Sequence, residues 1–225
     1  MVSGNEEIEE SSCDLKLVLL GESSVGKSSV VSRYVTGKFN KTNATIGAAF
    51  ITKEIKFVSE EGEHRVVNLE IWDTAGQERY RSLAPMYYRN TDVAVIVFDL
   101  TVPDSAAKAL AWVDELLSYV EKERREEIVI TVVGNKNDLI EGDDKIDSAM
   151  EQDIATLAKR PIWRVSAKTG EGIEELFQDI VRSIPKEKFR TKAQQQEATA
   201  RNKHVTLNPD SSAWHRITER TTCEC

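Results

Sequence analysis

The stretch "GESSVGKSS" at residues 21–29 has the residue types and spacing of a phosphate-binding loop, because it matches G-x-x-x-x-G-K-[ST]. Glycines let such a loop point its backbone N–H groups at phosphate oxygens, and the following helix adds its positive end. Lys27 is expected to bridge β- and γ-phosphates, and the Ser28 hydroxyl is a hard oxygen ligand suited to Mg²⁺. An accidental match in a Gly/Ser-rich turn is the alternative, and the strand before and helix after the loop argue against it. The expected phosphate-binding residues are Gly21, Ser23, Ser24, Val25, Gly26, Lys27, Ser28 and Ser29.

The string "WDTAG" at 72–76 adds a carboxylate at the end of a predicted strand, where open α/β sheets bind ligands. Asp73 would hold the shell of the Mg²⁺ ion, in part through water. Gln77 follows, and its amide can accept from and donate to one water, which would align that water with the terminal phosphorus. Taken alone, these two residues would be read as a turn residue and an exposed helix start. Beside a phosphate loop, Gln77 and Lys27 are the expected catalytic residues.

Two further strings, "NKND" at 135–138 and "SAK" at 166–168, end later strands and select the base. The Asp138 carboxylate can accept from the N1–H and the 2-amino group of guanine, and adenine offers neither donor. Either string alone is common in loops, but the two in this order after a phosphate loop predict a guanine nucleotide. The other members of the two strings would orient the loop, cover ring and ribose, and donate a backbone N–H to guanine O6: Asn135, Lys136, Ser166, Ala167 and Lys168.

These motifs are carried by short β-rich apolar runs that alternate with longer helix-period stretches between Leu15 and Pro185, which predicts an α/β fold. The turn "SEEGEH" joins the second and third strands as a hairpin, and the other strands need parallel crossovers, so the sheet should be mixed. The six expected strands are 15–20, 48–58, 65–72, 93–99, 128–134 and 162–166. The expected helices are 27–37, 104–125, 147–159 and 172–184, with a weaker helical stretch after Gly76.

Composition excludes several classes of function. The 225 residues carry a formal charge of -8 without a long Lys/Arg cluster, which argues against nucleic-acid binding. Apolar runs are far shorter than a membrane span, and the acidic start is unlike a signal peptide, so we expect a protein made and kept in the cytosol. Three cysteines and three scattered histidines predict neither a disulfide framework nor a zinc site.

Together with these motifs, "TIGAAF" at 45–50 and "IWDTAGQERYRSLAPMYYRN" at 71–90 resemble the Rab family of the Ras-superfamily small GTPases, and within it the early-endosomal, Rab-five-like branch. The resemblance implies a three-layer P-loop GTPase fold and a monomeric GDP/GTP switch with slow hydrolysis. It also implies exchange factors, GTPase-activating proteins, a GDP-dissociation inhibitor or escort protein, and endosomal tethering effectors.

The same resemblance assigns roles to further residues. Thr45 would reach Mg²⁺ and the γ-phosphate in the GTP state, Phe39 would cover the guanine, and Gly76 would lie beside the terminal phosphate. The loop from Phe39 to Thr45 is one residue shorter than this branch leads us to expect, which affects how the base is covered. An exposed aromatic triad would be read by effectors, although large aromatics are more often core residues. The triad consists of Phe50, Trp72 and Tyr87.

Residues 186–225 are polar and mildly basic, which predicts a disordered hypervariable tether after a GTPase domain at 14–185, itself preceded by an acidic extension at 1–13. The tether ends in Cys223 and Cys225, and this C-x-C ending resembles the Rab signal for double geranylgeranylation. One lipid chain binds membranes marginally and two anchor stably, so we expect the protein on the cytoplasmic face of endosomal membranes, cycling with the cytosol. Metal ligation or incidental thiols are the alternative.

Two other functions would also use a phosphate loop. A P-loop kinase or metabolic NTPase would need an acceptor domain or lid for which the chain leaves little room, and it would not explain "NKND". A scaffold that holds nucleotide permanently would not need Gln77, Lys27 and Ser28 together.

Overall fold

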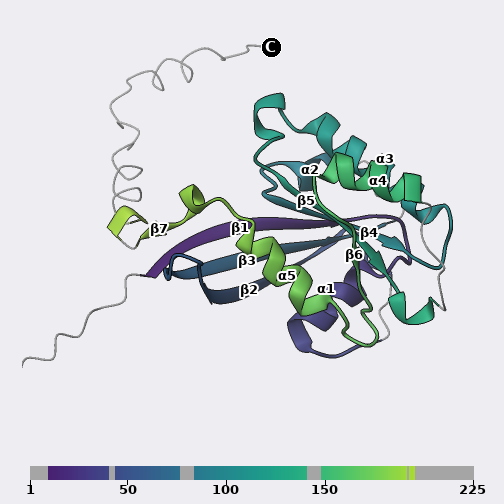
Figure 1. Cartoon of the computed structure of the whole chain (residues 1–225), viewed down its shortest axis with the longest axis horizontal. Helices are drawn as coiled ribbons and strands as arrows, with labels where there is room; N and C mark the ends of the chain where they lie inside the picture. Colours follow the sequence, from purple (N-terminus) through teal and green to yellow (C-terminus); the bar gives the residue numbers. More distant parts are fainter. Residues whose placement is uncertain (1–9, 41–43, 77–83, 141–147, 192, 196–225) are drawn as a thin grey trace, which may run out of the picture.

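The computed structural model describes residues 10–40, 44–76, 84–140, 148–191 and 193–195. Its centre is one mixed sheet with the strand order β2-β3-β1-β4-β5-β6, and a short β7 pairs with β1 (Figure 1). β2 and β3 form an antiparallel hairpin, β7 runs antiparallel to β1, and the remaining pairs are parallel. The strands are β1 (Glu10–Leu20), β2 (Ala48–Val58), β3 (His64–Thr74), β4 (Val93–Asp99), β5 (Val129–Asn135), β6 (Trp163–Arg164) and β7 (Arg190–Thr191).

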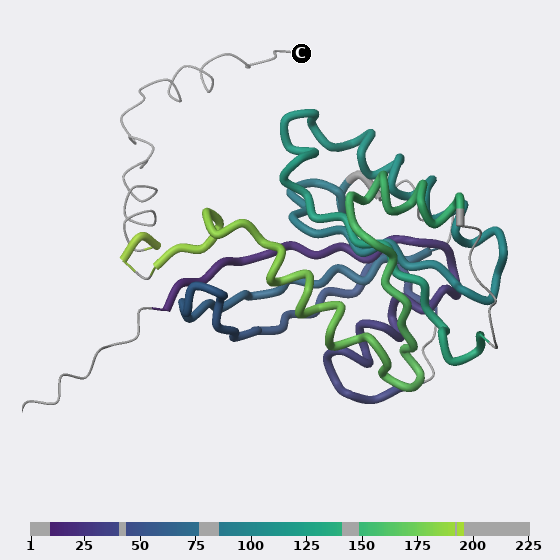
Figure 2. The backbone as a smooth tube through the Cα atoms, in the orientation of Figure 1, coloured from purple at the N-terminus to yellow at the C-terminus, as the bar shows by residue number. Residues whose placement is uncertain are grey.

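Helices cover both faces of this sheet, which gives the three layers that the sequence predicts. α1 and α5 lie on one face, while α2, α3 and α4 lie on the other, as the backbone trace also shows (Figures 1 and 2). The helices are α1 (Lys27–Thr36), α2 (Ala84–Tyr88), α3 (Ser105–Tyr119), α4 (Ser148–Ala158) and α5 (Ile173–Arg182), with short 3₁₀ turns that include η2 (Lys122–Arg124), η3 (Asn137–Leu139) and η4 (Lys186–Lys188).

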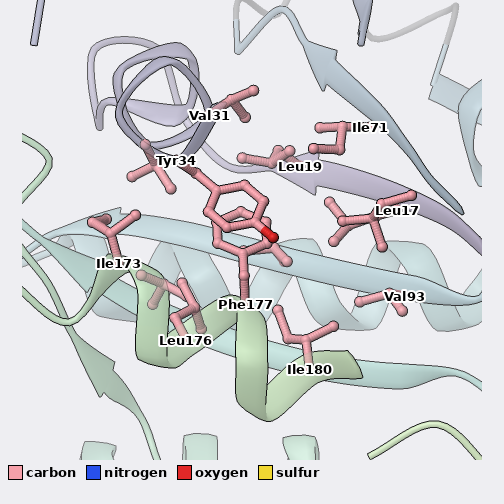
Figure 3. Close-up of a cluster of buried hydrophobic side chains, with 14 of the residues drawn as sticks. Leu17, Leu19, Val31, Tyr34, Ile71, Val93, Ile173, Leu176, Phe177 and Ile180 are labelled. Atoms are coloured by element: carbon pink, nitrogen blue, oxygen red, sulfur yellow. The ribbon is translucent and has the colours of Figure 1, made fainter. Parts of the chain in front are cut away.

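The core explains why β1 and β4 are nearly continuous apolar runs. In β1, Leu17 and Leu19 face the α1/α5 layer, whereas Val18 and Leu20 face the α3/α4 layer. Every residue of β4 is buried, as expected for a central parallel strand with helices on both faces. On the α1/α5 side, Tyr34 stacks on Phe177 with ring centroids 3.6 Å apart (Figure 3). Side chains of both helices therefore close the core over the strands that carry the motifs.

Several boundaries differ from the sequence-based prediction. β2 and β4 have the predicted bounds, but β1 begins at Glu10 instead of residue 15, so the predicted limit of the acidic extension falls inside this strand. β6 has two residues instead of five, and α3 ends at Tyr119 with η2 taking up part of the remaining stretch. The first residues of β1 lack the apolar periodicity on which the prediction depends.

The chain also continues its fold beyond Pro185, where the prediction places the start of the tether. β7 follows η4 and pairs Arg190 with Ser12 of β1. The Phe189 ring lies 6.2 Å from the Phe57 ring and 4.9 Å from the Arg65 guanidinium. The sheet consequently has a seventh, two-residue strand that the sequence did not predict. Within the described ranges, no helix combines the length and apolar character needed to cross a membrane.

Candidate nucleotide-binding site

The predicted motifs meet at the carboxyl edge of the parallel strands. β1 ends at Leu20 before the phosphate loop, β3 ends at Thr74, β4 at Asp99 and β5 at Asn135. Neighbouring parallel strands present their carboxyl ends at one edge, so loops that are far apart in the sequence lie together there. The structure thus brings the phosphate loop, the "DTAG" segment and the two base strings to one site.

The phosphate loop is organised around the Lys27 side chain. Its Nζ donates to the carbonyls of Gly21 at 2.7 Å and Glu22 at 2.8 Å. Burial lowers the pKa of Lys27 to about 8, against the opposing attraction of the Asp73 and Glu22 carboxylates. Gly26 has φ 99°, and a Cβ on it would lie 2.3 Å from Asn135 Nδ2, so only glycine fits at this position. The loop therefore holds a buried cation among carbonyls, where negative phosphate oxygens would stabilise it.

The predicted magnesium ligands lie together beside this lysine. The hydroxyl oxygens of Ser28 and Thr45 are 2.8 Å apart, and the Thr45 hydroxyl donates to Asp73 Oδ2 at 3.5 Å. Asp73 Oδ1 is buried and has no hydrogen-bond partner among the described residues. Burial raises the pKa of Asp73, partly offset by Ser28, Lys27 and Thr45. Buried polar atoms are rarely left unpaired, and three hard oxygens around an unpaired carboxylate oxygen fit the requirements of Mg²⁺.

The "DTAG" segment lies in close contact with the phosphate loop. A Cβ on Gly76 would lie 2.4 Å from both Lys27 Nζ and the Glu22 carbonyl oxygen, so a larger residue at 76 would displace one of them. Phe39, predicted to cover the base, has a side chain that is 47% exposed. Gln77, the predicted water-aligning residue, lies outside the described residues. Ser23 and Ser24 are exposed, whereas Val25 is buried.

Asn135 joins the phosphate loop to the "SAK" loop. Its Nδ2 donates to the Val25 carbonyl at 2.9 Å, and its Oδ1 accepts from the Ala167 N–H at 3.1 Å. The predicted role in orienting the loop agrees with these contacts. The Ala167 N–H, which the sequence analysis assigns to guanine O6, is used here by Asn135.

The two carboxylate oxygens of Asp138 have different surroundings. Oδ1 accepts from the Ser166 hydroxyl at 2.6 Å, while Oδ2 is buried, lies 3.4 Å from Lys168 Nζ and makes no hydrogen bond within the part of the chain that the structure describes. The Ser166 hydroxyl holds the pKa of Asp138 below its usual range, and Lys168 adds to this effect. The group is therefore an ionised acceptor of fixed orientation, which suits a ligand that offers adjacent N–H donors.

The structure adds one residue that the sequence analysis missed. Asp99, at the end of β4, accepts from Lys136 Nζ at 2.5 Å and from the Thr101 N–H at 2.9 Å. Burial opposes ionisation of Asp99, but the hydrogen bonds from Lys136 and Thr101 lower its pKa overall. Asp99 thus fixes the ammonium of a lysine that was expected to lie along the base and ribose. Its position at the end of a predicted strand was the available signal.

The predicted aromatic triad forms one cluster beside the site. Phe50 faces Trp72 across the β2–β3 pair with ring centroids 5.2 Å apart, and Tyr87 of α2 lies 6.1 Å from Trp72. Phe50 is 53% exposed, and the ammonium of Lys16 lies 5.1 Å from the Trp72 ring. Of the expected exposed triad, only Phe50 is exposed, whereas Trp72 and Tyr87 are half-buried and pack against the α3/α4 core. Ile46 and Met86, whose positions in the two branch-specific strings were not singled out, are exposed as well.

This fold and site define a phosphate-loop nucleotide-binding protein of the α/β class. The model of the Ras family matches residues 16–186, and the chain belongs to the Ras family of small GTPases. It is 42% identical over 219 residues to GTP-binding protein YPT52 of Saccharomyces cerevisiae, with 86% of this chain and 92% of that protein covered. It is 46% identical over 173 residues to GTP-binding protein ypt5 of Schizosaccharomyces pombe, with 76% and 78% covered.

A third relative, GTP-binding protein YPT53 of Saccharomyces cerevisiae, is 46% identical over 177 residues, with 76% of each chain covered. These matches confirm the resemblance to the Rab-five-like branch. As a small GTPase of this branch, the protein uses GTP, GDP and Mg²⁺, hydrolyses GTP to GDP and acts in endosomal vesicle traffic.

Proposed function

We propose that this protein is a membrane-anchored switch whose nucleotide state is read at one sheet edge. One observation carries the site assignment: Asp73 and Asp138, two aspartates at that edge, each have one buried carboxylate oxygen that makes no hydrogen bond with the described residues. An unpaired buried acceptor is costly, so each oxygen is suited to a ligand that supplies the missing partner. At Asp138 the partner is the N1–H and 2-amino pair of guanine, and at Asp73 it is a metal-bound water or Mg²⁺ itself.

At the phosphate end, Lys27 and the backbone of residues 21–29 hold the β- and γ-phosphates. Ser28, Thr45 and Asp73 would hold Mg²⁺, which supplies positive charge to the phosphate oxygens when bound. Gly76 abuts Lys27, and Gln77, the next residue in the sequence, is the residue whose amide would align the attacking water. Catalysis is then positioning together with charge stabilisation, and an activating protein would contribute an arginine.

At the base end, Asp138 reads the guanine while Ser166 and Lys168 hold its carboxylate in place. Asn135 connects the loop to the phosphate site, and the Lys136 and Phe39 side chains cover the ring. An adenine would offer no N–H donor to Asp138 Oδ2, which would then keep only its ion pair with Lys168, so the site discriminates against adenosine nucleotides.

The switch couples the third phosphate to a surface that partners read. Thr45 precedes β2 and Gly76 follows β3, so both segments that touch the phosphate site continue into the strands that carry Phe50 and Trp72. A change in either segment therefore reaches the partly exposed triad through a few covalently linked residues. Endosomal tethering effectors are the proposed partners of this triad in the GTP state, with exchange factors and GTPase-activating proteins acting on the same segments.

The membrane part of the proposal depends on the end of the chain. Cys223 and Cys225 lie two positions apart, and two geranylgeranyl groups there would anchor the protein stably where one would not. The polar tail beyond residue 195 supplies the reach, and a GDP-dissociation inhibitor or escort protein would cover the lipids in the cytosol. The proposed location is the cytoplasmic face of endosomal membranes.

Identification of the nucleotide tests the site assignment. We expect GDP or GTP to co-purify with the protein, and expect the affinity for GDP to exceed that for ADP by about 10⁴-fold or more, as in sites that hydrogen-bond the missing group. Inosine diphosphate, which lacks only the 2-amino group, should bind with intermediate affinity. Equal affinities for GDP and ADP would contradict the assignment of Asp138.

A further inference from the structure

Arg33 reaches from the phosphate side of the site to the base side. It lies in the last turn of α1, whose first residue is Lys27. Its Nε donates to the Ala167 carbonyl at 2.8 Å, and its Nη2 donates to the Lys168 carbonyl. The helix that begins at the phosphate loop is therefore bonded directly to the loop that carries the "SAK" string.

The third nitrogen of the same guanidinium binds the end of its own helix. Arg33 Nη1 donates to the Gly37 carbonyl at 2.7 Å, and the Gly37 N–H donates back to the Arg33 carbonyl at 2.9 Å. Gly37 precedes Phe39 by two residues, so the start of the segment that covers the base is held by the same side chain. Every Arg33 acceptor in these bonds is a neutral carbonyl, and the contact depends on the planar fork of donors more than on charge.

The Ala167 residue is consequently held on both sides. Its N–H donates to Asn135 Oδ1, which links it to the phosphate loop through Val25, and its C=O accepts from Arg33. Gly170 of the same loop lies beside the arginine stem, since a Cβ added to it would be 3.6 Å from Arg33 Cδ. Without the arginine, the Asn135 side chain would make the remaining described hydrogen bond between the phosphate side of the site and Ala167.

We propose that Arg33 is a positioning residue that sets how long the protein retains its nucleotide. By fixing Ala167 and Lys168 to α1, it holds the base-binding groups at a constant distance from the phosphate loop, so that one nucleotide engages both ends at once. The proposal rests on the proposed function, in which Asp138 and its neighbours bind guanine. Arg33 touches neither phosphate nor base, and it acts through the loop.

The release rate of a fluorescent GDP tests this role. We expect release from Arg33→Ala to be about tenfold faster or more, because two hydrogen bonds that hold the base loop are lost. Single-turnover hydrolysis of bound GTP should stay within about twofold of the parent, since the chemistry takes place at Lys27, Mg²⁺ and Gln77. Release at the parent rate from a folded, GDP-loaded Arg33→Ala protein would overturn the proposal.

Two further variants distinguish a positioning role of the Arg33 guanidinium from an effect of its charge and from an effect on the stability of the whole protein. Arg33→Lys keeps the charge, but a single ammonium does not reproduce the fork, so its release should remain clearly faster than that of the parent. Full rescue by lysine would contradict the fork argument. Arg160→Ala is the matched control, because Arg160 pairs with Asp179 between the end of α4 and α5, away from the base loop. Its release rate should equal that of the parent, and an equal acceleration in both variants would reduce Arg33 to a stability effect.

Removal of the metal provides the last distinction. Chelation with EDTA should accelerate release from parent and variant, while the ratio of their rates is retained, because Arg33 acts on the base side. If the variant and the parent released nucleotide at the same rate in EDTA, the effect of Arg33 would depend on the metal, and the proposal would be overturned. If the parent protein fails to bind guanine nucleotides, the proposed function fails. If it binds them and Arg33→Ala releases them at the parent rate, only this inference fails.

Discussion

The hydroxyl oxygens of Ser28 and Thr45 lie 2.8 Å apart, although one belongs to the first turn of α1 and the other to the segment before β2. Asp73 completes the group from the end of β3. Three parts of the chain thus contribute one oxygen-bearing side chain each to one point, so the position of the Thr45 segment depends on what that point binds. A divalent ion and a third phosphate are the ligands that would hold it there.

Ser28→Asn should weaken Mg²⁺ binding and reduce the affinity for GTP more than that for GDP. The amide is bulkier and a poorer Mg²⁺ ligand than the hydroxyl, and the Thr45 contact would be lost with it. The ratio of GTP to GDP affinity, measured at saturating Mg²⁺, should fall at least about tenfold, the loss expected for one contact to a charged group. Ser118→Asn is the control, because Ser118 donates to the Glu115 carbonyl on the surface of α3. An unchanged ratio would remove Ser28 from the metal site.

Gln77→Leu should leave GTP binding intact and slow single-turnover hydrolysis. Leucine has a similar size but cannot hydrogen-bond a water, and general acid–base positioning of this kind contributes roughly 10²–10⁴-fold to rates. We therefore expect hydrolysis to fall by at least about tenfold while GTP affinity changes little. Gln152→Leu on the exposed face of α4 is the matched control. Hydrolysis at the parent rate in Gln77→Leu would exclude this side chain from catalysis.

Asp138→Asn should change which base is bound. An amide in place of the carboxylate loses the charged acceptor for N1–H and the 2-amino group, and it gains N–H donors that suit the 2-carbonyl of xanthine. GDP affinity should fall by about 10²-fold or more, and affinity for xanthosine diphosphate should rise relative to the parent. The control is Asp153→Asn on exposed α4, which should alter neither affinity. If Asp138→Asn bound GDP as well as the parent, the base would have to be read elsewhere.

Sequence patterns predicted the bounds of those strands in which burial follows a regular pattern along the whole strand. β4 has the predicted bounds because its seven residues are all apolar or at the strand end, and β2 because most of it alternates between half-buried and exposed positions. The first residues of β1 were missed, since "ESSCD" shows no apolar alternation. They become strand because β3 pairs with them on one side and β7 on the other, which is tertiary pairing and not local preference.

The residues of the candidate site also fall into two groups, those that a local sequence pattern predicts and those that only tertiary contacts reveal. Motif residues such as Lys27 and Asp138 could be predicted because their spacing is set by local loop geometry. Arg33 could not, because its acceptors are backbone carbonyls that any sequence supplies, and one lies 134 positions away along the chain. Asp99 was missed because an aspartate at a strand end most often serves as a turn residue. Only the three-dimensional arrangement shows that it binds Lys136.

Replacing both Cys223 and Cys225 by Ser should release the protein from membranes. If each carries a geranylgeranyl group, binding falls by about 0.8 kcal/mol per buried CH₂ removed, which abolishes anchoring when both chains are lost. Lipid-modified parent protein should sediment with liposomes and the double variant should not. Single variants at either position should bind weakly and reversibly, since one chain is marginal. Sedimentation of the GTP-loaded double variant would point to another anchor.

Nucleotide binding should take up a proton above pH 8. Burial lowers the pKa of Lys27 to about 8, and negative phosphate oxygens beside Nζ would raise it again. Between pH 8 and the ordinary lysine value, the free protein has lost a proton that the complex retains, so nucleotide affinity should fall as pH rises through this window.

The folded, nucleotide-free protein also binds fewer protons than the unfolded chain in this pH window. Its stability should therefore gain from Lys27 as pH rises above 8, while the cost of burying the charge is fully present below 8.

Calorimetry of GDP binding in two buffers with different ionisation enthalpies measures this uptake directly. At pH 9 the observed enthalpy should depend on the buffer, with uptake approaching one proton for one titrating lysine. At pH 6.5 Lys27 is charged in both states, so its contribution should vanish, and the proton exchange that remains there belongs to other groups such as the terminal phosphate of GDP, with a pKa of about 6. An uptake that is equal at the two pH values would show that Lys27 stays protonated in the free protein. The Gly21 and Glu22 carbonyls, together with the attraction of the Asp73 and Glu22 carboxylates, would then be enough to keep the buried ammonium charged.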